Sequence, residues 1–524
     1  MRRRTIAVVG VVVILALAGV AVLLTRGADE RPGAVADPLA EALSFAPSSA
    51  PAVAQFDVQQ GSAQGRALRD LARTFPAARF AADGVRESVR TLGLDADEDL
   101  PSLLGGPLVA WGPPEAIVSL AASISALRLE LAPVLKAGVT AAIVGRGEDD
   151  VDATLDRAVD GRRLRRGPDL AGGVAQYALP RGAGVLGVRD ADLVLGADAA
   201  AVRRAFALHD NQGGLTRASF DARLGPLARV PALVRATAGA RALIAPRARG
   251  VPWVDALRQG ALTVAIQKPG IRLRVHLATD PAKVTDDQLP LAPGTEPPAP
   301  APGARPVHAA VRNLAQTIRV LDAGKDGLDV PFLKPLVDAL DTLDAVKGPL
   351  KTFGRIDVDA ALVDQLTGTT TITPEAKPGT VALRAELDDG GPLRTALNRI
   401  AAVPDFALDL AGVTLNVDRD GDAYTITRDD KAFMKAAVLG NTLVVTDDLG
   451  AGLRAIAARR PQKAAPGGAL ALHAAGSAIQ DELIRRFRLP GLARLVLGGF
   501  GDVDGSARAQ RSGLDLDATL KLNQ

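Results

Sequence analysis

Residues 271–277 read IRLRVHL and residues 514–520 read LDLDATL, and both segments alternate strictly between apolar and polar side chains. Successive side chains of a β-strand point to opposite faces, so each segment predicts a strand with one apolar and one polar face. A second strand-like run precedes each of them, at 262–267 and at 507–510, with a short turn between. The two hairpins predict antiparallel sheets that pack one face on a core and leave the other face wet.

Each hairpin lies at the end of one half of the chain, and the two halves are similar in sequence. Residues 94–112, LDADEDLPSLLGGPLVAWG, align without a gap to residues 356–374, IDVDAALVDQLTGTTTITP. The identical pairs are Asp95/Asp357, Asp97/Asp359, Leu100/Leu362, Leu104/Leu366 and Gly106/Gly368. Residues 177–206 correspond in the same way to residues 424–456, and each of these segments begins with one of the two tyrosines of the chain. This similarity predicts two copies of one module.

The second copy departs from the first at two informative positions. Thr367 replaces Gly105, and Thr373 replaces Trp111. A pocket formed at this place would therefore differ between the two modules.

A proline-rich stretch separates the halves. Residues 290–306 read PLAPGTEPPAPAPGARP, and proline at this density favours an extended polyproline II conformation. We therefore predict a linker over residues 284–305. Within the halves, the spacing of apolar residues predicts amphipathic helices between the strands. These helices are expected at 67–75, 84–92, 152–159 and 393–400.

The N-terminus has the pattern of a membrane segment. Three arginines at positions 2–4 precede an uncharged run from residue 6 to residue 24. As a helix this run spans roughly 28 Å, close to the bilayer core of roughly 30 Å, and it is longer than the usual apolar region of a signal peptide. We therefore expect an uncleaved signal-anchor, with a cleaved signal peptide as the alternative. The arginines place the short N-terminus in the cytoplasm and the rest of the chain outside the cell membrane.

The fold class predicted is α+β: a single N-terminal transmembrane helix followed by two related modules, each a mostly antiparallel sheet with helices packed on one face. The expected organisation is a cytoplasmic stub at 1–5, a transmembrane signal-anchor at 6–24, a juxtamembrane linker at 25–41, repeat 1 at 42–283, the proline-rich linker at 284–305 and repeat 2 at 306–524.

The composition removes several chemistries. The chain of 524 residues contains no cysteine, which excludes disulfides, thiol catalysis and thiolate metal sites, and only 4 histidines. No Gly-x-Ser-x-Gly, Ser-x-x-Lys or His-Glu-x-x-His motif occurs. Positive and negative charges are interspersed, so the formal charge of +3 does not indicate a nucleic-acid partner.

Two acidic motifs could suggest a site. Residues 416–422, NVDRDGD, resemble the start of a calcium loop, but Thr427 stands where that loop requires a glutamate. Strand-like flanks favour a hairpin with an Asp-Gly turn, and a weak surface calcium site is the alternative. Asp95, Asp97, Glu98 and Asp99 precede a helical turn, where carboxylates stabilise the helix dipole. We interpret this cluster as capping and solubility rather than acid–base catalysis.

The remaining polar groups are histidines and arginines. The histidines at 209, 276, 308 and 473 are far apart in sequence, so scattered surface positions are the expectation rather than a metal site. Two arginine clusters, 162–166 and 485–488, could meet anionic lipid or cell-wall polymer. A solvated loop for the first cluster and a helix end for the second are the simpler interpretations.

Several of these segments together resemble a known family. They are the strand-like opening at 52–58, Phe75-Pro76, Gly93-Leu94-Asp95, Leu103-Leu104-Gly105-Gly106 and the run 310–317, AVRNLAQT. The pattern is similar to a family of membrane-anchored bacterial proteins known only as a domain of unknown function. The resemblance covers most of residues 40–520 and implies a topology, but no activity, cofactor or site residue.

The sequence thus favours a non-catalytic interaction or structural protein of the bacterial cell envelope. It is expected to be held in the cytoplasmic membrane by residues 6–24 and to meet an envelope protein or an anionic lipid or polymer, without nucleic acid. No catalytic, cofactor-binding or metal-ligating residue is predicted, and no cofactor. The alternatives are a carrier that binds an apolar or lipid-like ligand between sheet and helices, and a hydrolase with an unrecognised site.

Overall fold

The computed structural model describes most of the chain beyond residue 35. The described residues are 36–57, 59, 61–74, 89–90, 94–95, 98–117, 131–161, 163–239, 250–268, 270–294, 298, 307–324, 341, 344–345, 347–352, 355–375, 377, 380–402, 408–410, 413–428, 431–459, 469–478, 480 and 499–523. The predicted signal-anchor at 6–24 lies outside them. Among the described residues, no helix combines the length and the apolar character needed to cross a membrane.

The chain divides into two compact units. Unit 1 contains the residues up to 243 together with Arg258–Leu277 and the last three residues, and unit 2 contains Ile244–Leu257 and Ala278–Lys521. Each unit is built on its own set of antiparallel strands, and each is described by itself.

The sheet of unit 1 has the strand order β4-β5-β6-β7-β3-β2-β1-β8-β9-β10. Every pairing from β4 across to β9 is antiparallel. The strands are β1 (Ala52–Phe56), β2 (Leu108–Gly112), β3 (Thr140–Val144), β4 (Arg165–Arg166), β5 (Ala175–Ala178), β6 (Val185–Arg189), β7 (Asp192–Gly196), β8 (Val234–Gly239), β9 (Leu257–Gln267) and β10 (Gly270–Thr279).

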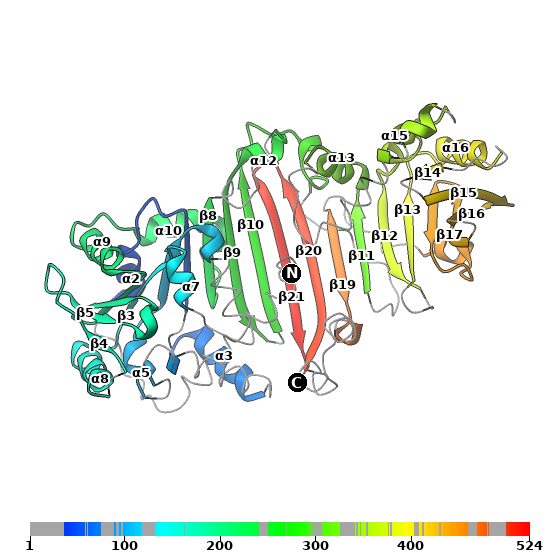
Figure 1. Ribbon diagram of the computed structural model, residues 1–524. Coiled ribbons are helices and arrows are strands. Elements are labelled where there is room, and N and C mark those ends of the chain that lie inside the picture. Colours follow the sequence, from blue (N-terminus) through cyan, green and yellow to red (C-terminus); the bar gives the residue numbers. More distant parts are fainter. Residues whose placement is uncertain are drawn as a thin grey trace. The chain divides into compact units, whose positions relative to one another are not determined.

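Helices cover both faces of this sheet. On one face, α2 (Pro38–Ser44), α9 (Ala199–Asp210) and α10 (Arg217–Leu224) pack on a core that includes Ala142 and Val194. On the other face, α5 (Leu100–Leu103), α7 (Leu131–Lys136) and α8 (Glu148–Asp160) pack on a core that includes Ile143 and Leu193. Figure 1 shows α9 and α8 on either side of β3 and β5. The prediction of helices on one face is therefore wrong for unit 1.

The reason for the two covered faces is visible in the central strands. All five residues of β1 and of β3 are buried, and β3 reads TAAIV without the alternation of a half-exposed strand. A strand that is apolar on both sides requires a packing layer on both sides. In α8, Val151, Leu155 and Ala158 share one helix face, which supplies one of these layers.

The sheet of unit 2 has the strand order β14-β15-β16-β17-β18-β13-β12-β11-β19-β20-β21. The strands are β11 (Val307–Arg312), β12 (Thr369–Pro374), β13 (Val381–Glu386), β14 (Leu408–Leu410), β15 (Val413–Asp420), β16 (Ala423–Arg428), β17 (Lys431–Leu439), β18 (Thr442–Thr446), β19 (Leu470–Ala474), β20 (Phe500–Gln510) and β21 (Gly513–Leu522).

The pairing order of the two units is the same. In unit 1 it runs β5-β6-β7-β3-β2-β1-β8-β9-β10, and in unit 2 it runs β16-β17-β18-β13-β12-β11-β19-β20-β21. Each position in one sheet therefore has a counterpart in the other. The α+β class of the sequence prediction is confirmed, because the strands are antiparallel and the helices lie between them in the chain.

Helices also cover unit 2, over a smaller part of its strands. On one face, α13 (Leu314–Gly324) and α16 (Gly391–Ala401) pack on a core that contains Ala385 and Leu443. On the other face, α17 (Leu453–Ala457) inserts Ile456 against Ala382 and Val444, so the prediction of helices on one face is wrong for unit 2 as well. The large apolar side chains that remain exposed among the described residues all belong to this unit: Ile372, Val381, Leu472 and Leu516.

Most of the predicted secondary structure is confirmed. The hairpins expected at 262–277 and 507–520 are β9–β10 and β20–β21, and their strands are longer than predicted. The helices expected at 67–75, 152–159 and 393–400 correspond to α3 (Ala63–Thr74), α8 and α16. The helix expected at 84–92 lies almost entirely outside the described residues.

The first part of the predicted linker packs on unit 2. Val284 and Leu289 are buried, and the side-chain amide of Gln316 donates to the carbonyl oxygens of Asp286, Leu289 and Leu291 at 2.7, 2.9 and 3.3 Å. Residues 284–294 are thus held by α13. Most of 295–306 lies outside the described residues.

Candidate functional site

A row of polar side chains crosses one face of the central strands of unit 2. His308 on β11 pairs with His473 on β19, and His473 pairs in turn with Asp504 on β20. Ala310 lies two residues after His308, on the same face, and pairs with Thr371 of β12. Thr373 lies two residues after Thr371 and therefore belongs to this face too. We call His308, His473, Asp504 and Thr373 the polar row.

Three members of the polar row, His308, His473 and Asp504, contact one another in series. The rings of His308 and His473 stack with centroids 4.9 Å apart, and His308 is buried. His473 Nδ1 lies 2.7 Å from Asp504 Oδ1, and Lys521 Nζ lies 2.8 Å from Asp504 Oδ2. Burial alone would raise the pKa of the Asp504 carboxyl, but the hydrogen bonds from His473 and Lys521 outweigh burial and lower this pKa.

The same positions in unit 1 are mostly apolar. The shared strand order matches His308, His473, Asp504 and Thr373 to Val53, Thr237, Ala261 and Trp111 respectively. Val53, Ala261 and Trp111 belong to the core under α2 and α10. One module therefore uses this sheet face as a hydrophobic core, whereas the other places histidines and a carboxylate there. The exchange of Trp111 for Thr373 was the one sign of this difference in the aligned sequences.

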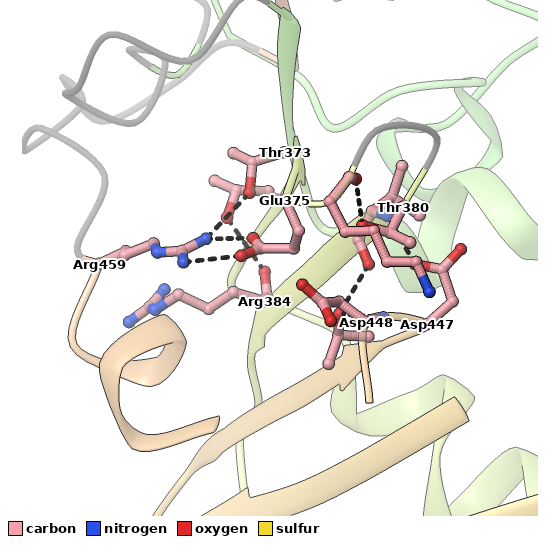
Figure 2. A network of polar contacts seen from close by, with 11 residues as sticks. Thr373, Glu375, Thr380, Arg384, Asp447, Asp448 and Arg459 are labelled. Atoms are coloured by element: carbon pink, nitrogen blue, oxygen red, sulfur yellow. Dashed lines mark hydrogen bonds and ion pairs between the residues drawn. The ribbon is translucent and has the colours of Figure 1, made fainter. Parts of the chain in front are cut away.

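A second polar network lies at the end of β12, next to Thr373 (Figure 2). Arg459 donates two hydrogen bonds to the buried carboxylate of Glu375 and approaches Thr373 Oγ1 at 3.5 Å. Arg384, which is buried, donates from Nε to the carbonyl of Ala457 at 2.9 Å. These bonds fasten the end of α17 to the sheet, so the network has a structural role.

The polar row offers one arrangement known from acid–base catalysis, a histidine oriented by a carboxylate. A nucleophile held by the second ring nitrogen would complete it. Within the described part of the chain, His473 makes no hydrogen bond to a serine or threonine hydroxyl, and it contacts Asp504 and His308.

A separate cluster of titratable groups forms in unit 1. Glu41 of α2, Asp192 at the start of β7 and His209 of α9 bring ligand atoms within 4.8 Å of one another. His209 Nδ1 lies 3.6 Å from Glu41 Oε1 and 2.6 Å from Ser44 Oγ. The imidazole stacks on the ring of Phe45 at 4.5 Å, which fixes its orientation.

The expectation of scattered surface histidines is wrong for three of the four. His308 and His473 meet across two strands, and His209 joins two carboxylates. Sequence spacing gave no signal of this, because the pairs are formed by strand register and helix packing.

The acidic cluster at 95–99 has two roles. Asp95 caps a helical turn, and Asp99 forms an ion pair. Asp95 Oδ1 accepts the Glu98 amide at 3.1 Å, and Asp357 Oδ1 accepts the Ala360 amide at 3.2 Å at the matching position, as the capping interpretation predicts. Asp99 differs: it is fully buried and accepts from Arg163 at 2.9 Å. The Asp95 amide also donates to Asp99 Oδ2 at 2.7 Å, so Asp99 takes part in the cap as well as in an ion pair and, being buried, does not serve solubility. Asp97 lies outside the described residues.

Residues 416–422 form a hairpin, as predicted. Strands β15 and β16 pair directly up to Asp420 and Ala423, so the turn consists of Gly421 and Asp422, one residue later than expected. Gly421 has a φ of 61°, a left-handed conformation that glycine adopts without strain.

The first arginine cluster is not a solvated loop throughout. Arg163 pairs with Asp99, Leu164 is buried, and Arg165 and Arg166 form the exposed edge strand β4 beside β5. The second cluster, residues 485–488, lies outside the described residues.

Comparisons with known proteins add little to this picture. Neither protein-family models nor curated proteins show a match to the chain. Among solved structures, crystal form III of TP0453 aligns over 47% of this chain and 82% of its own chain, with 8% sequence identity and a TM-score of 0.25. A TM-score this low carries no argument about fold or function.

Proposed function

We propose that the chain is a single-pass, membrane-anchored protein outside the bacterial cell membrane that acts by binding an envelope partner protein, without catalysis. Residues 6–24 would supply the anchor, and the resemblance to the membrane-anchored bacterial family belongs to the same proposal. Two related modules, one diverged for binding, would account for the shared strand order and for the differences between the units.

The observation that carries the proposal is an exposed row of apolar side chains on unit 2, opposite the polar row. Ala309 on β11 pairs with Ile372 on one side and Leu472 on the other, so the three side chains point to one face. Ile372 is 44% exposed and Leu472 is 38% exposed. We call these three residues the apolar row. Single exposed apolar residues are ordinary, but a contiguous row on adjacent strands is typical of an interaction surface.

The matching positions in unit 1 are all alanine. The strand order aligns Ala309, Ile372 and Leu472 with Ala54, Ala110 and Ala236. Ala54 and Ala110 are buried, with 1% and 0% of their surface exposed. At these positions unit 2 has larger apolar side chains than unit 1, although they are more exposed. A strand with a purely structural role would place its larger apolar side chains where they are buried.

The same row favours a second candidate, the carrier of an apolar or lipid-like ligand. A flat apolar strip can cover an acyl chain as well as a protein side chain. A protein partner is preferred because the strip lies on exposed strands, whereas small-molecule sites enclose most of their ligand.

Site-directed photocrosslinking tests both candidates. A photoreactive amino acid is placed at Ile372 or at Leu472 of the full-length chain in its own membrane, with the exposed position Arg203 on α9 as the control. We expect discrete protein adducts from the two row positions and none from position 203. A Leu472→Glu substitution should abolish the adduct at position 372, whereas Arg203→Glu should leave it unchanged.

The outcomes separate the hypotheses. Adducts to lipid alone would favour the carrier. Identical adduct patterns from all three positions, or none from any, would contradict a binding role for the apolar row.

A further inference from the structure

Glu41, Asp192 and His209 converge from three elements of unit 1 that share one core. The helix α2, the strand β7 and the helix α9 are joined through buried contacts that include Leu43, Val194 and Phe206. Asp192 follows the turn at Asp190 and Ala191, which aims the start of β7 toward α2. A site built on packed elements holds its ligand atoms more precisely than a site on a loop.

The basic side chain beside these two carboxylates is the imidazole of His209, whose Nδ1 lies 3.6 Å from Glu41 Oε1. Among the residues that the structure describes, no lysine or arginine forms an ion pair with Glu41 or Asp192. The nearby guanidinium of Arg189 is committed to Asp210, with bonds of 2.6 and 3.1 Å. Two carboxylates beside one imidazole, with no described lysine or arginine paired to them, are a charge arrangement that a bound cation would stabilise.

We propose that Glu41, Asp192 and His209 form a binding site for a divalent transition-metal ion of the Zn²⁺ class. One imidazole nitrogen and two carboxylate oxygens are a ligand set that Zn²⁺ accepts, and three protein ligands leave a fourth position for water. Tetrahedral ligands at bond lengths of about 2.0–2.1 Å lie roughly 3.4 Å apart. One ligand atom from each of the three residues already lies within 4.8 Å of the others, so side-chain rotations would bring them to this spacing.

Ser44 and Phe45 supply the outer layer of this site. The Ser44 hydroxyl lies 2.6 Å from the carbonyl oxygen of Glu41 and 2.6 Å from His209 Nδ1, and the Phe45 ring holds the plane of the imidazole. A partner on one ring nitrogen orients a histidine that ligates through the other, so Ser44 on Nδ1 leaves Nε2 of His209 as the ligand atom. The site is not duplicated, because the position of Asp192 is occupied by Thr442 in unit 2.

Metal binding to the full-length protein in detergent tests the proposal. Isothermal titration with ZnSO₄ should give one equivalent per chain, and Co²⁺ should produce the visible absorption of a low-symmetry site. In the variants Glu41→Gln and Asp192→Asn, affinity should fall at least about tenfold. Neither change should lower the melting temperature without metal, because both remove like-charge repulsion. Asp190→Asn, which removes a nearby charge without touching a ligand, is the matched control and should bind as the wild type does.

Three results would overturn the proposal. One is a wild-type chain that binds no Zn²⁺ or Co²⁺. Another is wild-type affinity in both ligand variants. The third is an equal loss in Asp190→Asn, which would reduce the effect to general surface charge.

Discussion

Asp192 shows how tertiary packing changes the chemistry of one residue. It is an ordinary aspartate in a turn-strand sequence, RDADLVLG, and nothing in these letters marks it. Its half-buried place beside Glu41 raises the pKa of the carboxyl to about 7 from the usual 3.8. The folded chain therefore keeps a proton that the unfolded chain has already lost at pH values between these two limits.

This difference predicts a pH-dependent loss of stability. When a carboxyl group binds its proton more tightly in the folded state, the free energy of unfolding of the protein falls as pH rises from about 4 to about 7. The decrease levels off above the folded pKa. Asp192→Asn removes this contribution. The melting temperature of the variant minus that of the wild type, measured without metal from pH 4.5 to 8.5, should grow by a few degrees and then level off above about pH 7. A difference that stays constant with pH would show that Asp192 titrates normally.

At the scale of elements, the segment 284–294 illustrates how a sequence that reads as a linker can become part of a unit. The segment forms one short 3-10 helix at Asp286–Gln288, and its prolines do not prevent it from packing. Leu289 has no exposed surface, and Gln316 of α13 binds three carbonyl oxygens of the segment. A side-chain amide replaces the backbone partners that an irregular segment lacks.

The burial of Leu289 predicts that shortening its side chain lowers the free energy of unfolding measurably. Leu289→Ala should destabilise unit 2 by about 2–5 kcal/mol, the usual range for a fully buried leucine. Leu291→Ala is the matched control, because Leu291 is only half buried and should cost clearly less. Chemical denaturation of the full chain, followed by circular dichroism, measures both. Equal and small effects would mean that the segment behaves as a solvated linker.

At the scale of the whole molecule, the proposal depends on an anchor at 6–24. If this segment is an uncleaved signal-anchor, protein extracted from its own membrane should begin at the encoded N-terminus and remain in the membrane pellet after alkaline carbonate treatment. Leu15→Arg should shift protein out of the pellet, because a central arginine costs about 3 kcal/mol on insertion. The control substitution Thr25→Arg lies beyond the apolar run and should have little effect.

A mature N-terminus after residue 24, with the protein in the soluble fraction, would contradict the anchor and favour a cleaved signal peptide. Intact mass measurement and fractionation give this result directly.

What the sequence determined by itself are the local features. Alternation at 271–277 and 514–520 predicted the two hairpins, and apolar spacing predicted α8 and α16. The positions of Asp95 and Asp357 before a helical turn predicted their capping hydrogen bonds. These signals are reliable because a strand, a helix turn or a cap is decided by residues within a few positions of one another.

Only the tertiary structure decided which distant groups meet. The second helical layer of unit 1, the ion pair of Asp99 with Arg163, the stack of His308 on His473 and the cluster of Glu41, Asp192 and His209 all join residues far apart in the chain. Their contacts depend on strand register and on the angle at which helices pack, and a shift of one residue in register would send each strand side chain to the other face. Sequence patterns within a few residues do not indicate the strand register or the helix packing angle.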